Sequence, residues 1–136
     1  MKKVIENTGG GQLEYAPYKN GISITRYRGI ATIVSIPEVI EEKPVIAIEK
    51  KAFANCKKLK KIVIGKNIRS IGSKAFYKCK KLKKITIKSK KLVKIGKNAF
   101  KGISKKAVIK VPASKKKKYK KLLKKKGLPS KARIIK

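Results

Sequence analysis

The chain has no histidine, no aspartate and no tryptophan in its 136 residues, and its two cysteines are Cys56 and Cys79. Without His and Asp, neither a Ser-His-Asp nor a Cys-His catalytic arrangement can be assembled. Two cysteines alone do not complete a tetrahedral zinc site. Neither GxGxxG nor GxxxxGK[ST] occurs, so the sequence offers no glycine-rich phosphate loop. We therefore expect no enzyme, no cofactor and no metal.

Acidic residues are few and confined to one part of the chain. All six are glutamates within residues 1–49, where six basic residues balance them. Residues 50–136 hold the other 35 of the 41 basic residues and no acid, which gives the net charge of +35. The hydrophobic content of 41% is too high for a disordered polycation. Length and composition indicate one folded domain, residues 1–136.

Long hydrophobic runs are also missing. No stretch of 18 apolar residues occurs, so we expect no membrane span. The start Met1-Lys2-Lys3 is followed by Val4-Ile5-Glu6, which is not the apolar core of a signal peptide. Two locations stay open: the cytoplasm if Met1 is the native start, or the cell surface or exterior if the chain is a segment of an exported protein.

An internal repeat organises the middle of the chain. An Ala-Phe pair recurs at Ala52, Ala75 and Ala99, and an Ile precedes each Ala by four residues. The heptapeptide Cys-Lys-Lys-Leu-Lys-Lys-Ile begins at Cys56 and again, unchanged, at Cys79. Short runs that alternate apolar and other residues predict strands at 34–36, 62–64, 85–87, 109–111 and 133–135. The repeating unit is about 23 residues long, and a unit of this length buries its apolar side only by stacking on its neighbours. The long connections between successive strands favour parallel strands.

The two ends predict caps for such a stack. Residues 13–15 and 22–25 flank the segment Tyr18-Lys19-Asn20-Gly21. Its Asn-Gly pair predicts a hairpin with positive φ at both of these positions. A helix is expected over about 114–126, with Ser114 as its N-cap and Gly127 just after its end. Its narrow apolar stripe favours a cap over a helix lying on a membrane. The stripe residues are Tyr119, Leu122 and Leu123.

The segment Ile71–Ile87 carries the pattern Ile-Gly-x-x-Ala-Phe-x-x-Cys-x-x-Leu-x-x-Ile-x-Ile, which resembles the BspA-type leucine-rich repeat of bacterial surface proteins. The resemblance covers about residues 22–112. It implies an α/β leucine-rich-repeat solenoid with one curved parallel sheet, used for attachment or protein binding at a cell surface. Within it we expect a leader and hairpin cap over 1–33, repeats over 34–112 and a helix-strand cap over 113–136. Glu49 replaces the repeat's Gly, Ile103 replaces its Cys, and residues 104–107 lose its Leu.

The repeated lysines are the candidate binding residues: Lys57, Lys58, Lys60, Lys61, Lys80, Lys81, Lys83 and Lys84. Stacking would bring equivalent lysines within about 5 Å, with repulsion of about 0.8 kcal/mol per pair in water. Such rows favour a polyanion-binding face on a monomeric, non-catalytic adhesion or protein/glycan interaction module. Its partners would be anionic surface polymers, glycans or host proteins.

Other interpretations of the charge remain. An AT-rich genome enriches lysine, although this does not explain the missing acids. Non-specific nucleic-acid binding is an alternative, but arginine is scarce and only Tyr77 and Tyr119 lie among the lysines to stack on bases. A structural spacer within a larger surface protein is a third.

Cys56 and Cys79 would lie close enough for a disulfide, but we favour two reduced thiols in the core.

Overall fold

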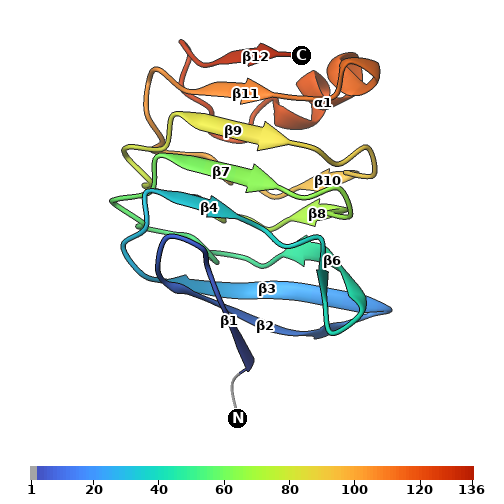
Figure 1. The fold of residues 1–136 in the computed structure, drawn as a ribbon. Coiled ribbons are helices and arrows are strands. Elements are labelled where there is room, and N and C mark those ends of the chain that lie inside the picture. The colour runs from blue at the N-terminus through green and yellow to red at the C-terminus, as the bar shows by residue number, and fades with distance from the viewer. Residues whose placement is uncertain (1–2) are drawn as a thin grey trace.

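The computed structural model describes residues 3–136, which form a stack of turns with a parallel sheet along one side (Figure 1). Five strands make this sheet, in the order β12-β11-β9-β7-β4, and all neighbours are parallel. They are β4 (Ile33–Ser35), β7 (Lys61–Ile64), β9 (Lys84–Ile87), β11 (Val108–Lys110) and β12 (Arg133–Ile135). The five strands predicted from the alternating runs are confirmed, as is the leucine-rich-repeat solenoid.

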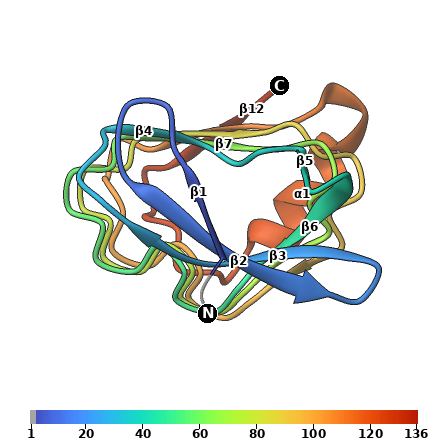
Figure 2. The ribbon, with the colours of Figure 1, turned by 60° about the horizontal axis from the view of Figure 1, so that its bottom comes forward.

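A second sheet forms the opposite side of the stack (Figure 2), and the sequence did not predict it. The repeated Ile of each turn lies in it, at Ile48, Ile71 and Ile95. Strands β3, β6, β8 and β10 run parallel there, and β1, β2 and β5 pair antiparallel with their neighbours. The strands are β1 (Lys3–Glu6), β2 (Gln12–Tyr18), β3 (Gly21–Arg28), β5 (Val39–Ile40), β6 (Lys43–Ile48), β8 (Ser70–Ile71) and β10 (Lys94–Ile95).

A ladder of aromatic rings runs through the core between the two sheets. The rings of Tyr27, Phe53, Phe76 and Phe100 stack with centroids 5.6, 5.2 and 5.5 Å apart. The three Phe side chains are fully buried, as the repeat predicts. Tyr27 is an additional first member from β3, and its hydroxyl accepts a hydrogen bond from the Ala31 N–H at 3.0 Å. The ladder therefore begins in the hairpin, so the hairpin shares its core with the repeats.

The repeat glycines allow neighbouring turns to approach closely. A Cβ on Gly72 would lie 2.3 Å from the Lys50 nitrogen, and one on Gly96 would lie 2.2 Å from the Ser73 nitrogen. Glu49 occupies the same frame without this restriction, because its neighbour is the extended strand β3 rather than a preceding turn. The departure of Glu49 from the repeat pattern thus follows from its place at the start of the stack.

Two residues of each turn have left-handed backbone conformations, a feature that the sequence analysis missed. One of them directly precedes the Ala of the Ala-Phe pair, and the other lies two residues after the Phe. The first set comprises Lys51, Lys74 and Asn98, with φ of 60°, 55° and 57°. The second comprises Asn55, Lys78 and Gly102, with φ of 62°, 58° and 87°. Asn and Gly adopt this conformation readily, whereas lysine does so at a cost.

The N-terminal hairpin is present, but the predicted turn is wrong. Tyr18 pairs with Gly21, so the two turn residues are Lys19 and Asn20, and Lys19 has a φ of 53°. Gly21 belongs to β3 instead. A Cβ there would lie 2.6 Å from the Pro44 carbonyl oxygen, so this glycine permits close packing rather than a turn.

The C-terminal helix is shorter than predicted. A 3₁₀ turn η1 (Ala113–Lys115) leads into α1 (Lys116–Leu123). Ser114 lies inside η1 and is not the N-cap; that position belongs to Lys115, with no side-chain cap hydrogen bond. Gly127 is not the residue directly after the helix: Lys124 is the C-cap and Lys125, with a φ of 63°, follows it. Gly127 lies two residues further on, where a Cβ would meet the Lys101 backbone. The apolar stripe faces the core as expected of a cap: Tyr119 and Leu123 are buried, and Leu122 is half-buried.

Candidate binding face of the parallel sheet

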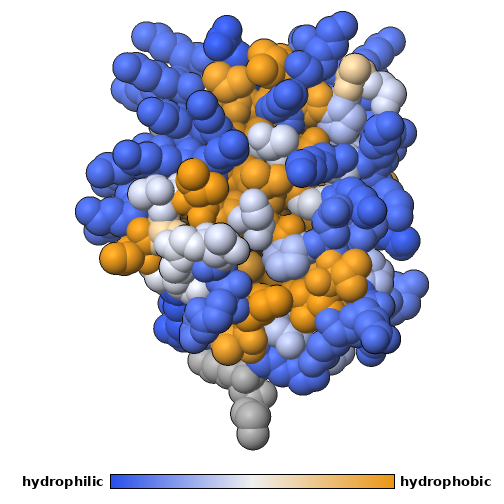
Figure 3. Space-filling model, in the orientation of Figure 1, coloured by the Kyte–Doolittle hydropathy of each residue, from blue (hydrophilic) through white to orange (hydrophobic). Residues whose placement is uncertain are grey.

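The outward side of the parallel sheet presents two rows of in-register side chains. One row passes through Ile33, Lys61, Lys84, Val108 and Arg133, and the other through Ser35, Val63, Thr86, Lys110 and Ile135. Val63, Thr86 and Lys110 point outward, the first two half-buried and the third exposed. Figure 3 shows apolar groups down the middle of this face with hydrophilic side chains on both sides. The face therefore combines an apolar strip with charged borders.

The structure brings the repeated lysines into adjacent positions of neighbouring turns. Lys61 on β7 pairs with Lys84 on β9, and the Lys83 N–H donates to the Lys60 carbonyl oxygen over 3.0 Å. The other four candidates occupy equivalent turns, each closed by a Leu N–H that donates to the Cys carbonyl three residues earlier. These four are Lys57, Lys58, Lys80 and Lys81. All eight side chains except half-buried Lys61 are exposed.

Few carboxylates lie near these lysines. Within residues 3–136, Lys66 is the one cation after residue 49 that forms an ion pair, to Glu38 at 3.9 Å. The candidate lysines have no such partner in the described part of the chain. Neighbouring in-register strands are about 4.8 Å apart, so the pairs repel at short range unless anions bind between them. This arrangement concentrates uncompensated positive charge along one border of the sheet face. We call it the lysine border, and its residues are Lys57, Lys58, Lys60, Lys61, Lys80, Lys81, Lys83 and Lys84.

The lysine rows end after two turns. The third turn closes one residue later, because the Ala107 N–H donates to the Ser104 carbonyl while Val108, directly after Ala107, pairs with Lys84. Lys106 therefore occupies the leucine position, so the leucine is lost as the sequence indicates, and the buried Ala107 takes the frame of Lys83. Val108 then follows Lys84 in the outward row. The candidate site is therefore limited to the first two turns of the heptapeptide.

The aromatic residues available beside the lysines are fewer than predicted. Tyr119 is fully buried, so it is not available to stack on a base. Tyr77 is half-buried between two lysines, with the Lys74 and Lys78 ammonium nitrogens 5.2 and 5.3 Å from its ring centroid. Both ammonium groups are within the distance at which a cation interacts with the face of an aromatic ring, so the Tyr77 ring is already engaged. One aromatic surface is a poor platform for a single-stranded nucleic acid.

The two cysteines are free thiols that interact with each other. Cys79 is buried, and its thiol donates to the Phe53 carbonyl oxygen over 3.0 Å. Its hydrogen bond with Cys56, together with burial, raises the pKa of the Cys79 thiol. The same hydrogen bond and the nearby Arg26 charge lower the pKa of half-buried Cys56, against the opposing effect of burial. The pair fits the interpretation of reduced core residues, with Cys56 the more reactive member.

The structure adds one observation on metal sites and one on membrane-spanning helices. No cluster of three or more His, Cys, Asp or Glu residues suited to a metal occurs within residues 3–136. The same residues include no helix with the length and apolar character needed to cross a membrane.

Comparison with solved structures places this fold among leucine-rich-repeat proteins. A leucine rich cell surface protein from Faecalibacterium prausnitzii is 25% identical, with a TM-score of 0.63 over 82% of this chain and 37% of that one. A leucine-rich repeat protein from Bacteroides capillosus is 25% identical, with a TM-score of 0.62 over 82% of this chain and 83% of that one. The T. pallidum leucine rich repeat protein is 22% identical, with a TM-score of 0.55 over 75% and 70% of the two chains.

The family follows from the sequence itself. Residues 31–130 match the model described as the BspA type leucine rich repeat region (6 copies). The chain belongs to the BspA-type leucine-rich repeat family, which confirms the resemblance seen in its repeats. The chain spans only 37% of the length of the Faecalibacterium protein. No match was found among curated protein sequences.

Proposed function

We propose that this chain is a non-catalytic interaction module of a bacterial surface protein, and that it holds polyanionic partners along the lysine border of its parallel sheet. The observation that carries the proposal is the register of the lysines. Lys60 and Lys61 lie next to Lys83 and Lys84 on neighbouring turns, without a carboxylate between them. A row of cations at strand spacing matches the repeated charges of an anionic polymer better than a single ion.

The surface location rests on the family and on the Faecalibacterium relative, whose description is that of a cell surface protein. The module would then contact anionic wall polymers, acidic glycans or host proteins as part of adhesion. The apolar strip beside the lysines adds area that a protein partner needs, since interface centres are depleted in charge. Lysine rather than arginine favours contacts to charge over recognition of a base edge.

The experiment compares binding of a sulfated polysaccharide and of random-sequence duplex DNA between 50 and 300 mM salt. The variant replaces Lys80, Lys81, Lys83 and Lys84 by Gln. The matched control removes four exposed charges elsewhere, at Lys117, Lys118, Lys121 and Lys131. We expect the first variant to lose polysaccharide binding at 150 mM salt and the control to keep it.

Three outcomes would contradict the proposal. Equal losses in both variants would show that only net charge matters. DNA binding that survives 150 mM salt as well as polysaccharide binding would favour a nucleic-acid-binding protein, whose non-specific affinity is typically about 10⁻⁴–10⁻⁶ M near physiological salt. Binding of neither probe would favour a structural spacer.

A further inference from the structure

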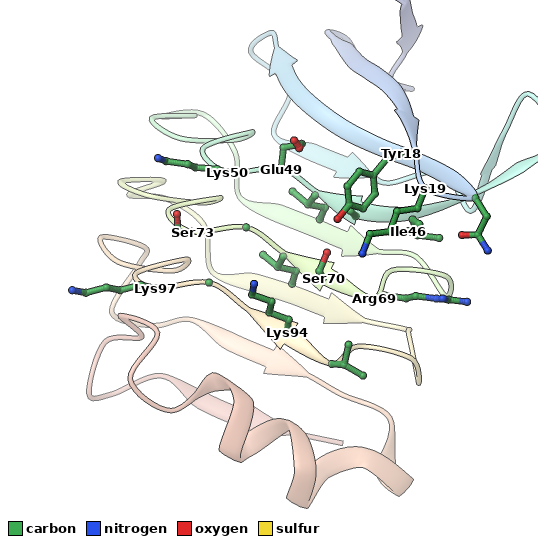
Figure 4. A pocket seen from close by; sticks show the side chains of 17 residues that line it. Tyr18, Lys19, Ile46, Glu49, Lys50, Arg69, Ser70, Ser73, Lys94 and Lys97 are labelled. Carbon is green, nitrogen blue, oxygen red and sulfur yellow. The ribbon is translucent and has the colours of Figure 1, made fainter.

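A groove lies on the second sheet, away from the lysine border. It encloses about 730 Å³, within the range of ligand-sized clefts. Strands β6, β8 and β10 form its floor, and the tip of the β2–β3 hairpin lies over one end (Figure 4). At that tip the side chains of Tyr18 and Lys19 point toward the floor near Ser70 (Figure 4). Two parts of the fold that are distant in sequence therefore build one site.

The floor is low because the repeat places small residues there. Ala47 pairs with Ser70, and Ser70 with Lys94, along one in-register row. The next row contains Gly72 and Gly96, where close approach of the preceding turn excludes any side chain. The larger residues Ile48 and Ile71 point into the core and are buried. The low floor thus follows from the spacing of the turns, and the hairpin tip closes one end of the groove.

The groove combines apolar surface with cations and hydroxyl groups. Its basic residues are Lys19, Lys50, Arg69, Lys94 and Lys97, all exposed, and its one acid is Glu49. The hydroxyl groups of Ser70 and Ser73 and the amide of Asn20 add donors and acceptors. Exposed apolar surface is limited to Tyr18, 37% exposed, and Val93, 61% exposed. Charge complementarity therefore favours an anionic ligand, and the apolar surface of the groove adds contact area for its uncharged parts.

We propose that this groove binds an acidic oligosaccharide, a short chain of carboxylated or sulfated sugars, independently of the lysine border. The Lys19 ammonium lies 5.3 Å from the Tyr18 ring centroid, so one sugar face would stack on the other side of this ring at the hairpin end. The floor hydroxyls and the Asn20 amide at the hairpin tip pair with sugar hydroxyls, and Arg69, Lys94 and the rim lysines hold the acidic groups. An acidic peptide in extended form would gain less, because the backbone groups of the floor strands already pair with one another.

Titration of the isotope-labelled full chain with a sulfated, carboxylated heparin tetrasaccharide at 150 mM salt, followed by amide NMR shifts, tests the proposal. We expect shifts to concentrate at residues 18–20, 47–50, 69–73 and 93–97. The variant Arg69→Gln/Lys94→Gln should weaken binding about tenfold, while Lys117→Gln/Lys118→Gln should not. Tyr18→Leu, which keeps an apolar side chain at the hairpin tip, should weaken binding without lowering the unfolding midpoint.

Neutral cellotetraose and a hexaglutamate peptide serve as competing probes. Weak or absent binding of both supports an acidic-sugar site, whereas hexaglutamate binding as tight as the tetrasaccharide overturns it in favour of a peptide groove. Shifts confined to residues 57–61 and 80–84 overturn the groove site but support the lysine border. If only the variant that replaces Lys80, Lys81, Lys83 and Lys84 by Gln loses tetrasaccharide binding, the groove site is likewise overturned and the lysine border is supported. Each proposal can therefore fail while the other stands.

Discussion

The hydroxyl group of Tyr119 donates a hydrogen bond to the Ser89 carbonyl oxygen over 2.7 Å, which fastens helix α1 to the loop after β9. The same hydroxyl accepts from the Leu92 N–H at 3.1 Å. Ser89 is itself buried, and its side chain donates to the Ile68 carbonyl and accepts from the Lys91 N–H. One phenol therefore satisfies two backbone groups that water does not reach.

Replacing that phenol should destabilise the C-terminal cap. Tyr119→Phe leaves the Leu92 N–H and the Ser89 carbonyl buried without their partner, so we expect a loss of about 1–3 kcal/mol in the free energy of unfolding. Urea unfolding followed by circular dichroism measures it. Tyr77→Phe, on the surface, is the matched control and should change stability by less than about 0.5 kcal/mol. Equal effects would refute the role of the hydrogen bonds.

The repeat glycines predict an effect that depends on position within the stack. Gly96→Ala would place a Cβ 2.2 Å from the Ser73 nitrogen, so neighbouring turns must separate. We expect a loss of about 3–5 kcal/mol, in the range of severe backbone disruption. Glu49→Ala, in the same frame but beside β3, should lie within about 0.5 kcal/mol of the parent. Thermal melts of the two variants distinguish them, and similar midpoints would contradict the packing argument.

The left-handed positions offer a stabilising substitution. Lys51 has a φ of 60°, and the equivalent residue two turns later is Asn98, with a φ of 57°. Lys51→Asn should raise the free energy of unfolding by up to about 1 kcal/mol, because Asn adopts this conformation at lower cost than Lys. Lys50→Asn removes the same charge at a neighbour without positive φ. If both variants gain equally, relief of charge rather than backbone conformation is the cause.

Salt should stabilise this fold. The in-register lysine pairs repel by about 0.8 kcal/mol each in water, and ions screen that repulsion. We expect the unfolding midpoint to rise between 10 and 200 mM NaCl. Lys60→Glu places a carboxylate beside Lys83 and should reduce the dependence on salt more than Lys60→Gln does. A midpoint that stays constant across this range would falsify the argument.

The thiols should differ in reactivity. The lowered pKa of Cys56 provides thiolate at lower pH than an ordinary cysteine, whereas the raised pKa and burial of Cys79 keep it protonated. Iodoacetamide at pH 8 should label Cys56 in the folded protein, and Cys79 only after denaturation. The Cys79→Ala variant removes the hydrogen bond that lowers the pKa of Cys56, so the pH dependence of Cys56 labelling should move to higher pH. Mass spectrometry after timed quenching measures both, and equal labelling of the two native thiols contradicts the assignment.

The repeat pattern predicted the parallel sheet because apolar alternation and the Ala-Phe frame have a fixed period. It did not reveal β8 and β10, since two-residue strands carry no alternation of their own. Local signals failed where a distant contact decides the structure. Gly21 was predicted as a turn residue, but the position needs a glycine because a Cβ would clash with the Pro44 carbonyl. Gly127 has a φ of 88°, so its glycine follows both from its backbone conformation and from the nearby Lys101 backbone.

The candidate lysines were recognisable from the heptapeptide, but the groove was not. Its floor residues Ala47, Ser70 and Gly72 carry no chemistry that a sequence pattern reveals. The groove exists because the hairpin tip at Tyr18 projects over a sheet that was itself not predicted. Only the fold brings these two features together.

The stacked rings of Phe53, Phe76 and Phe100 have a consequence for how such a protein changes in length. Each interior ring meets an equivalent ring on both sides, so duplication of one turn would insert another ring into the ladder without altering either cap. A copy of residues 56–78 or of residues 79–101 would also bring the four lysines of its heptapeptide, further basic residues and no acid. Elongation by gene duplication would thus increase charge together with length, and the lengthened domain would bind more counterions than the original one.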